Sequence, residues 1–175
     1  CSCDSSATAQ LKSSVDGSSC GCDDGFSDSG VRYADGTVRL QSVDLESDAN
    51  GTFFGITRDW TNGNGYDRGN FFGSGSVIAD QPTLVKIDAN KLAVIADGHT
   101  SYQFSRTSSS APWVGEAFLQ NTLTYDTGTN EYVFSDAAGS EYRFYNFDAS
   151  LASHQQGALH TSKDPGGNTI TNHYD

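Results

Sequence analysis

The chain of 175 residues contains no methionine, only three prolines, and only ten lysine and arginine residues against 22 acidic ones. Without a methionine it has no initiator of its own, so we expect a processed product or an excised piece of a longer protein. No apolar run is long enough to span a bilayer, and we expect no transmembrane segment. The formal net charge is −12 and the basic residues are scattered, which argues against a nucleic-acid partner and against an anionic membrane surface.

Glycine and aromatic residues are plentiful, while helix formers are scarce. The chain has 19 glycines, and aromatic residues make up 11% of it. From Gly30 onward, short segments of alternating polarity are separated by turn signals, as in residues 100–104, where Thr100, Tyr102 and Phe104 alternate with Ser101 and Gln103. This pattern predicts an all-β fold: a mostly antiparallel, sandwich-like domain of about a dozen short strands over residues 31–175.

Residues 1–30 form a different segment, a head rich in cysteine, glycine, serine and aspartate. Such a composition cannot bury enough apolar surface to order itself. We expect disulfides to staple it, with bonds between the two cysteine pairs favoured over strained bonds within each Cys-x-Cys. A four-sulfur metal site, free thiols, bonds between chains and lipidation of the first cysteine remain alternatives. The two pairs are Cys1 with Cys3 and Cys20 with Cys22.

An Asn/Gly-rich loop after a predicted strand is the best candidate for a ligand site. Its oxygens suit Ca²⁺ and its aromatic rings suit stacking on a sugar, although the spacing is not that of an EF-hand. The simpler interpretation makes Trp60 a packing anchor at the end of the strand. We expect no other metal or cofactor. The candidate residues of this loop are Asp59, Trp60, Asn62, Asn64, Tyr66 and Asp67.

Two further motifs bear on modification and catalysis. Asn50-Gly51-Thr52 is an N-glycosylation sequon in a predicted turn, so Asn50 is a candidate acceptor. None of the four histidines has a His-x-x-x-His spacing, and the carboxylates lie mainly in turns. We therefore expect no catalytic residue and no enzymatic activity.

The end of the chain carries the most informative motif. Pro165-Gly166-Gly167-Asn168 predicts a turn, and the strand after it alternates up to Tyr174-Asp175. This strand could add to a neighbouring copy, because an unpaired strand presents open backbone groups. Its candidate assembly residues are Asn168, Ile170, Asn172 and Tyr174.

That tail resembles one unit of the RHS/YD-repeat family. The segments 31–40, 51–52 with 57–63, 143–147 and 155–157 resemble the region before the first repeats of large bacterial members. The resemblance implies secretion and a β-rich scaffold. The chain departs from the family because it holds only one such unit, and no catalytic residue of the family maps onto it.

Together these features predict a non-enzymatic structural protein, extracellular or at a cell surface, that assembles with copies of itself into a filament or a surface layer. The alternative is an adhesin or carbohydrate-binding module that recognises surface glycans. A hydrolase is a third possibility, supported only by scattered carboxylates and histidines.

Overall fold

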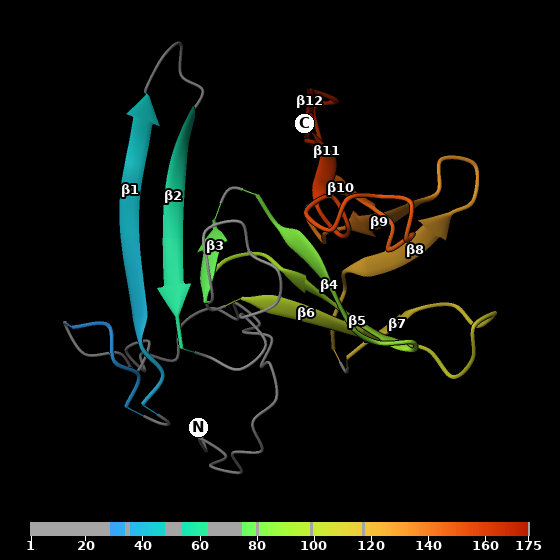
Figure 1. Cartoon of the computed structure of the whole chain (residues 1–175), viewed down its shortest axis with the longest axis horizontal. Helices are drawn as coiled ribbons and strands as arrows, with labels where there is room; N and C mark the ends of the chain where they lie inside the picture. The colour runs from blue at the N-terminus through green and yellow to red at the C-terminus, as the bar shows by residue number, and fades with distance from the viewer. Residues whose placement is uncertain are drawn as a thin grey trace. The chain divides into compact units, whose positions relative to one another are not determined.

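The computed structural model of the chain describes residues 29–33, 36–47, 54–62, 75–79, 81–98, 100–116 and 118–174. These residues form twelve strands in three antiparallel sheets, which confirms the predicted all-β, sandwich-like fold (Figure 1). Within the described ranges, no helix is long and apolar enough to cross a membrane. The chain divides into two compact units: residues 1–81 with 96–101, and residues 82–95 with 102–175.

Unit 1 contains a three-stranded sheet in the order β1-β2-β3. The long hairpin of β1 and β2 keeps regular antiparallel pairing except for a bulge at Asp44, where the register shifts between Val43 and Leu45. Ahead of this hairpin, Val31 and Val38 form an isolated antiparallel bridge. The strands are β1 (Arg39–Ser47), β2 (Phe54–Thr61) and β3 (Ser76–Ile78).

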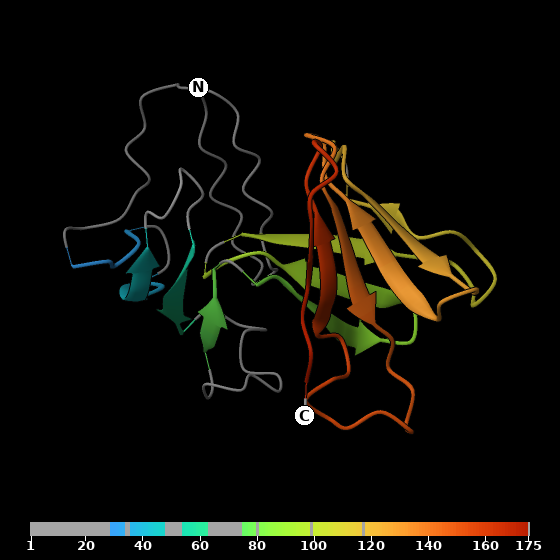
Figure 2. The ribbon, with the colours of Figure 1, turned by 90° about the horizontal axis from the view of Figure 1, so that it is seen from above.

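Unit 2 contains two sheets that face each other (Figure 2). The first has the order β4-β5-β6-β7, with strands β4 (Thr83–Asp88), β5 (Lys91–Ile95), β6 (Ser101–Ser105) and β7 (Val114–Gly115). Ser101 itself, the first residue of β6, belongs to unit 1. The second sheet has the order β12-β11-β10-β9-β8, with strands β8 (Thr122–Asp126), β9 (Glu131–Ser135), β10 (Glu141–Tyr145), β11 (Leu159–Lys163) and β12 (Thr169–Thr171).

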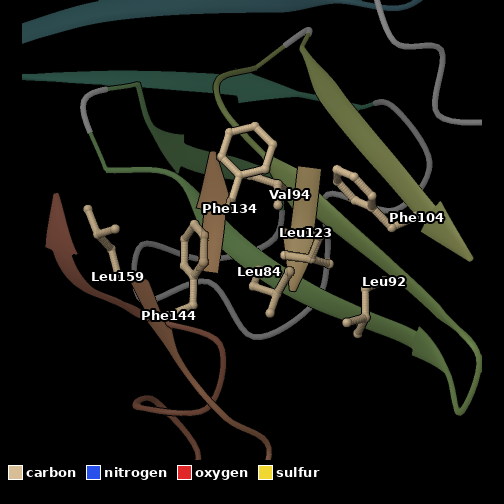
Figure 3. Packing of buried hydrophobic residues seen from close by; sticks show 8 residues of the cluster. All are labelled: Leu84, Leu92, Val94, Phe104, Leu123, Phe134, Phe144 and Leu159. Atoms are coloured by element: carbon tan, nitrogen blue, oxygen red, sulfur yellow. The ribbon is translucent and has the colours of Figure 1, made fainter. Parts of the chain in front are cut away.

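The core of unit 2 lies between these two sheets. Inward-pointing side chains of both sheets, aliphatic and aromatic alike, meet in this core (Figure 3). Phe134 lies near the centre, with its ring stacked on Tyr102 at 5.4 Å and edge-to-face with Phe104 at 6.1 Å between centroids. The buried cluster consists of Leu84, Leu92, Val94, Phe104, Leu123, Phe134, Phe144 and Leu159.

One glycine of unit 2 is required by a close backbone approach. Gly157 has a φ of +76°, and a Cβ at this position would lie 2.0 Å from the carbonyl oxygen of Leu84. The Leu84 N–H also donates to the Gly157 carbonyl at 2.8 Å. The 157 segment therefore lies directly on β4, where any side chain larger than hydrogen would clash.

Candidate functional site

Strand β12 ends the five-stranded sheet and is the candidate site for assembly. It pairs with β11 on one side, and β11 lies between it and the rest of the sheet (Figure 1). All three of its residues are exposed, and the Ile170 side chain is 66% exposed. An exposed apolar side chain on an edge strand is a typical point of contact with another strand. We call the side of Thr169–Thr171 that faces away from β11 the β12 edge.

The hydrogen bonds to β11 determine which backbone groups point out of this edge. Asn172 donates its N–H to the His160 carbonyl at 2.8 Å, and Asp164 donates to the Asn168 carbonyl at 3.0 Å. The register is regular between these points, with Ser162 opposite Ile170. Because backbone groups alternate in direction along a strand, Ile170 also bonds toward β11. Thr169 and Thr171 consequently direct their N–H and C=O groups away from the sheet.

The opposite edge of the same sheet differs from the β12 edge. Leu123, the second residue of β8, is only 2% exposed and belongs to the core cluster. On the facing sheet, the edge strand β4 is bonded to the 157 segment, because the Leu84 N–H donates to the Gly157 carbonyl. Every other described strand of unit 2 with three or more residues contains at least one buried residue, whereas β12 contains none.

A row of paired residues runs across the sheet to Ile170. Leu123 pairs with Phe134, Phe134 with Tyr142, Tyr142 with Ser162, and Ser162 with Ile170. Cross-strand partners share one face of a sheet, so this row lies on the core side. Burial is nearly complete at Leu123 and Phe134 and falls along the row to 66% exposure at Ile170. The core layer thus ends in an uncovered apolar side chain.

The predicted Pro-Gly-Gly-Asn turn positions β12. Gly167 has a φ of +90°, which favours glycine. Asp164 accepts hydrogen bonds from the Asn168 side-chain amide at 2.7 Å and from its backbone N–H at 2.8 Å. These bonds hold the pKa of the Asp164 carboxyl below its ordinary value. The turn chemistry therefore fixes where β12 begins.

Beyond β12, the chain folds back onto β11. The Tyr174 hydroxyl and the Asn172 side-chain amide both donate to the Leu159 carbonyl, at 2.9 and 3.1 Å. The Tyr174 ring lies edge-on to Tyr145 at 6.1 Å, and burial raises the pKa of its phenol. Of the four predicted assembly residues, Asn168, Asn172 and Tyr174 thus make bonds within the molecule, and Ile170 alone is exposed as a bare apolar side chain.

A charged cluster covers the outer face of the same sheet. Glu131 is buried and accepts a hydrogen bond from Arg143 at 3.4 Å, and its other oxygen pairs with Nδ1 of His160. Arg143 also forms ion pairs with Asp126 at 3.1 Å and Glu141 at 2.9 Å. These contacts tie together strands β8 to β11. Because the Glu131 carboxylate bonds both His160 and Arg143, the cluster serves to hold the sheet that carries β12.

Two described residues of the predicted ligand loop, Asp59 and Trp60, point apart. Asp59 and Trp60 are neighbours on β2 and so point to opposite faces of the three-stranded sheet. Asp59 is fully buried, and its carboxylate accepts from the Arg39 guanidinium, the Gln41 amide and the Gly98 N–H, each at 3.0 Å. We call this the Asp59 node. Both carboxylate oxygens of Asp59 accept hydrogen bonds from these three donors.

The remaining predicted sites fall partly outside the described residues. Trp60 is 38% exposed beside its strand partner Leu40, and Asn62 accepts a hydrogen bond from the Val38 N–H at 2.7 Å. Within the described part of the chain, no group of three or more His, Cys, Asp or Glu residues could hold a metal ion. The predictions for Cys1, Cys3, Cys20, Cys22, Asn50, Asn64, Tyr66 and Asp67 lie outside the described residues.

The groups that matter most at the edge and in the node were not among the residues predicted from the sequence. Thr169 and Thr171 carry the outward backbone groups, and the i, i+2 alternation from Asn168 to Asn172 already contained that signal. Arg39 and Gln41 also alternate along β1, but their acidic partner became visible only with the register of the hairpin. Comparison with protein-family models, curated proteins and solved structures found no match to this chain. The resemblance to RHS/YD repeats therefore stays a prediction.

Proposed function

We propose that this protein is a non-enzymatic structural module of an extracellular or surface assembly, and that copies of it join by strand addition at the β12 edge. The observation that carries the proposal is the edge itself: an exposed strand whose Thr169 and Thr171 backbone groups point outward beside the exposed Ile170. Strand addition needs only such backbone groups and a side chain to bury.

Several of the devices by which proteins protect an exposed strand are missing from β12 itself. Bulges, charged side chains and prolines are among those devices. Strand β12 has regular pairing and the uncharged sequence Thr-Ile-Thr. It is short, which limits nonspecific pairing and makes a defined partner necessary. These properties favour a specific contact over general aggregation.

The experiment replaces an outward N–H without disturbing the hairpin. Thr171→Pro removes an N–H that faces away from β11, a position at which an edge strand tolerates proline. Thr171→Val is the matched control, because it keeps the N–H and the β-branched shape. Ile170→Pro removes an N–H that faces β11 and should break the hairpin itself. Sedimentation velocity over a wide concentration range, with electron microscopy and with reducing and oxidising buffers, measures assembly.

We expect the wild type and Thr171→Val to grow in mass with concentration in reducing buffer, and Thr171→Pro to stay monomeric with an unchanged circular dichroism spectrum. A wild type that stays monomeric at every concentration would refute self-association. Assembly of Thr171→Pro as strong as that of the wild type would refute the β12 edge as the contact. Assembly seen only under oxidising conditions would assign it to the cysteines instead.

The second candidate, glycan recognition, is favoured by the partly exposed ring of Trp60 on the face opposite Asp59. Partly exposed aromatic rings provide stacking surfaces for sugars. Binding on a glycan array that is lost in Trp60→Ala and kept in Trp113→Phe would support this function. Equal binding by Trp60→Ala would exclude Trp60 from any glycan site.

A further inference from the structure

We infer that the partner of β12 is the β12 strand of a second copy, paired antiparallel about a two-fold axis that passes through Ile170. This inference rests on the proposed function and specifies its partner and register. The pairing is isologous: each copy presents the same surface, so Thr169 of one copy faces Thr171 of the other.

The directions of the backbone groups support this register. In an antiparallel pair, residues that bond across the interface must face residues that do the same. Thr169 and Thr171 are the two residues of β12 that point outward, and they lie symmetrically about Ile170. When the pair is centred on Ile170, Thr169 of each copy lies opposite Thr171 of the other. The N–H and C=O groups of these residues can then bond across the interface. The whole of β12 is then used.

The side chains support the same centre. Ile170 would face its own copy in a non-hydrogen-bonded pair, where the Cα atoms lie about 4.5 Å apart and side chains pack closely. It is 66% exposed and ends the row that begins at Leu123 and Phe134. In the pair, that row would continue through Ile170 into the second copy, and the two five-stranded sheets would become one continuous sheet.

Charge affects this pairing in a predictable direction. Each copy carries a formal net charge of −12, so two copies repel each other at low ionic strength. The strand that would make the contact is uncharged. Added salt screens the repulsion and leaves the strand contact in place, so dimerisation should strengthen as salt rises.

Cysteine crosslinking tests the register directly. In Ile170→Cys, the two introduced thiols would lie opposite each other at a separation that a disulfide can bridge. Trypsin cleavage after Lys163 then yields peptide 164–175, whose only cysteine is the introduced one. We expect a disulfide-linked dimer of this peptide under mild oxidation. Thr171→Cys is the register control, and Val114→Cys is the control for an exposed strand position away from β12.

A second pair of variants leaves Ile170 in place. Thr169→Cys and Thr171→Cys copies, one of them labelled with ¹⁵N, are mixed and oxidised. We expect the mixed 169–171 disulfide in clear excess over either symmetric product. This arm keeps the inference testable even if Ile170→Cys changes the fold.

The outcomes separate the register from the function. Linkage of 171 to 171 in place of 170 to 170 would overturn the Ile170-centred register and leave β12 assembly standing. If the thiol introduced by Ile170→Cys linked only to the native cysteines, the β12–β12 pairing would be overturned. A wild type that assembles without any of the expected links in the variants would refute this inference alone, whereas a wild type that never assembles would refute the proposed function.

Discussion

The most deeply buried residues of the two units differ in kind. In unit 2, the sheets enclose aliphatic and aromatic side chains, with Phe144 and Val94 fully buried. In unit 1, the covered face of the sheet holds Asp59 at 0% and Thr61 at 2% exposure, while Leu40 on the other face is 55% exposed. The first unit is thus organised by hydrogen bonds to a buried charge and the second by packing.

The difference teaches that alternation in a strand gives two faces but does not say which face is buried. A carboxylate is costly to bury unless donors satisfy it. Asp59 meets this condition because β1 supplies Arg39 and Gln41, and the 96–101 segment supplies the Gly98 N–H. Once these donors are arranged around one residue, the polar face is the one that the unit covers.

The edges of the two units differ as well. Strand β1 has a bulge at Asp44, whose carboxylate pairs with Arg58 at 2.9 Å through Nη2, and the Arg39 N–H donates to the Gly30 carbonyl at 2.8 Å. A bulge and charged side chains are devices that prevent edge pairing. Strand β12 has neither of them. The comparison therefore predicts assembly through unit 2 and not through β1.

The largest effect should come from truncating the core of unit 2. Phe144 is 0% exposed in the centre of the five-stranded sheet. Phe144→Ala should lower the free energy of unfolding of unit 2 by about 3–5 kcal/mol, because it removes buried apolar surface and leaves a cavity. Urea unfolding followed by tryptophan fluorescence measures this change.

The two tryptophans allow each unit to be followed separately. Trp113 lies in unit 2 and packs against its core, with the Arg106 guanidinium 4.4 Å from its ring, and Trp60 lies in unit 1. Trp60→Phe leaves a reporter of unit 2, and Trp113→Phe leaves a reporter of unit 1. Phe144→Ala should shift the unfolding midpoint seen by Trp113. An unchanged Trp113 transition would contradict the packing described for unit 2.

Removing the buried carboxylate of unit 1 should have the next largest effect. Asp59→Ala leaves the Arg39 guanidinium and two further donors without their acceptor, and should destabilise unit 1 by about 3 kcal/mol. The transition reported by Trp60 measures the loss. Asp59→Asn keeps the shape and one acceptor oxygen, so its effect should be smaller. If Asp59→Ala and Asp59→Asn were equally mild, the node would not organise this unit.

The node can also be disturbed from the opposite side. A Cβ at Gly98 would lie 2.6 Å from the Cβ of Asp59. Gly98→Ala should therefore destabilise unit 1 by about 1–3 kcal/mol, because the crowded backbone and side chain must shift. Combining Gly98→Ala with Asp59→Gly should cost less than the sum of the two, since Asp59→Gly removes the Cβ that the new methyl group would meet. Full additivity of the two losses would contradict their direct contact.

The smallest predicted effect is a pH dependence at the turn before β12. Hydrogen bonds from Asn168 lower the pKa of Asp164 in the folded protein, so the turn is stabilised above the unfolded value of about 3.9 and loses that support as the pH falls through the folded value. The NMR signal of the Asn168 side-chain amide should move over that acidic range. Asp164→Asn should remove the transition, and a signal that does not respond to pH would contradict the proposed turn chemistry.

Much of unit 2 could be predicted from the sequence, because its strands alternate regularly and its turns use glycine and asparagine. The Pro165–Asn168 turn and the strand after it lie where the motif indicated. Asp59 was predicted beside Trp60 in a single ligand loop, but both lie in β2, where neighbouring side chains point to opposite faces. Tyr174 was predicted on the assembly strand, but its bond to the Leu159 carbonyl depends on how β11 is placed. Local sequence patterns predict where turns occur and which residues share a face of a strand. The contacts between residues distant in sequence depend on how the strands pack, which these patterns do not show.

The most direct test of the central claim is amide hydrogen exchange at β12, followed by NMR as the protein concentration rises. Assembly through this edge predicts that the Thr169 and Thr171 amides exchange rapidly in dilute protein and slow down with concentration. The Ile170 amide, which faces β11, should be protected throughout, and Gln41 on β1 should not change. Thr169 and Thr171 amides that exchange rapidly in fully associated protein would contradict the account.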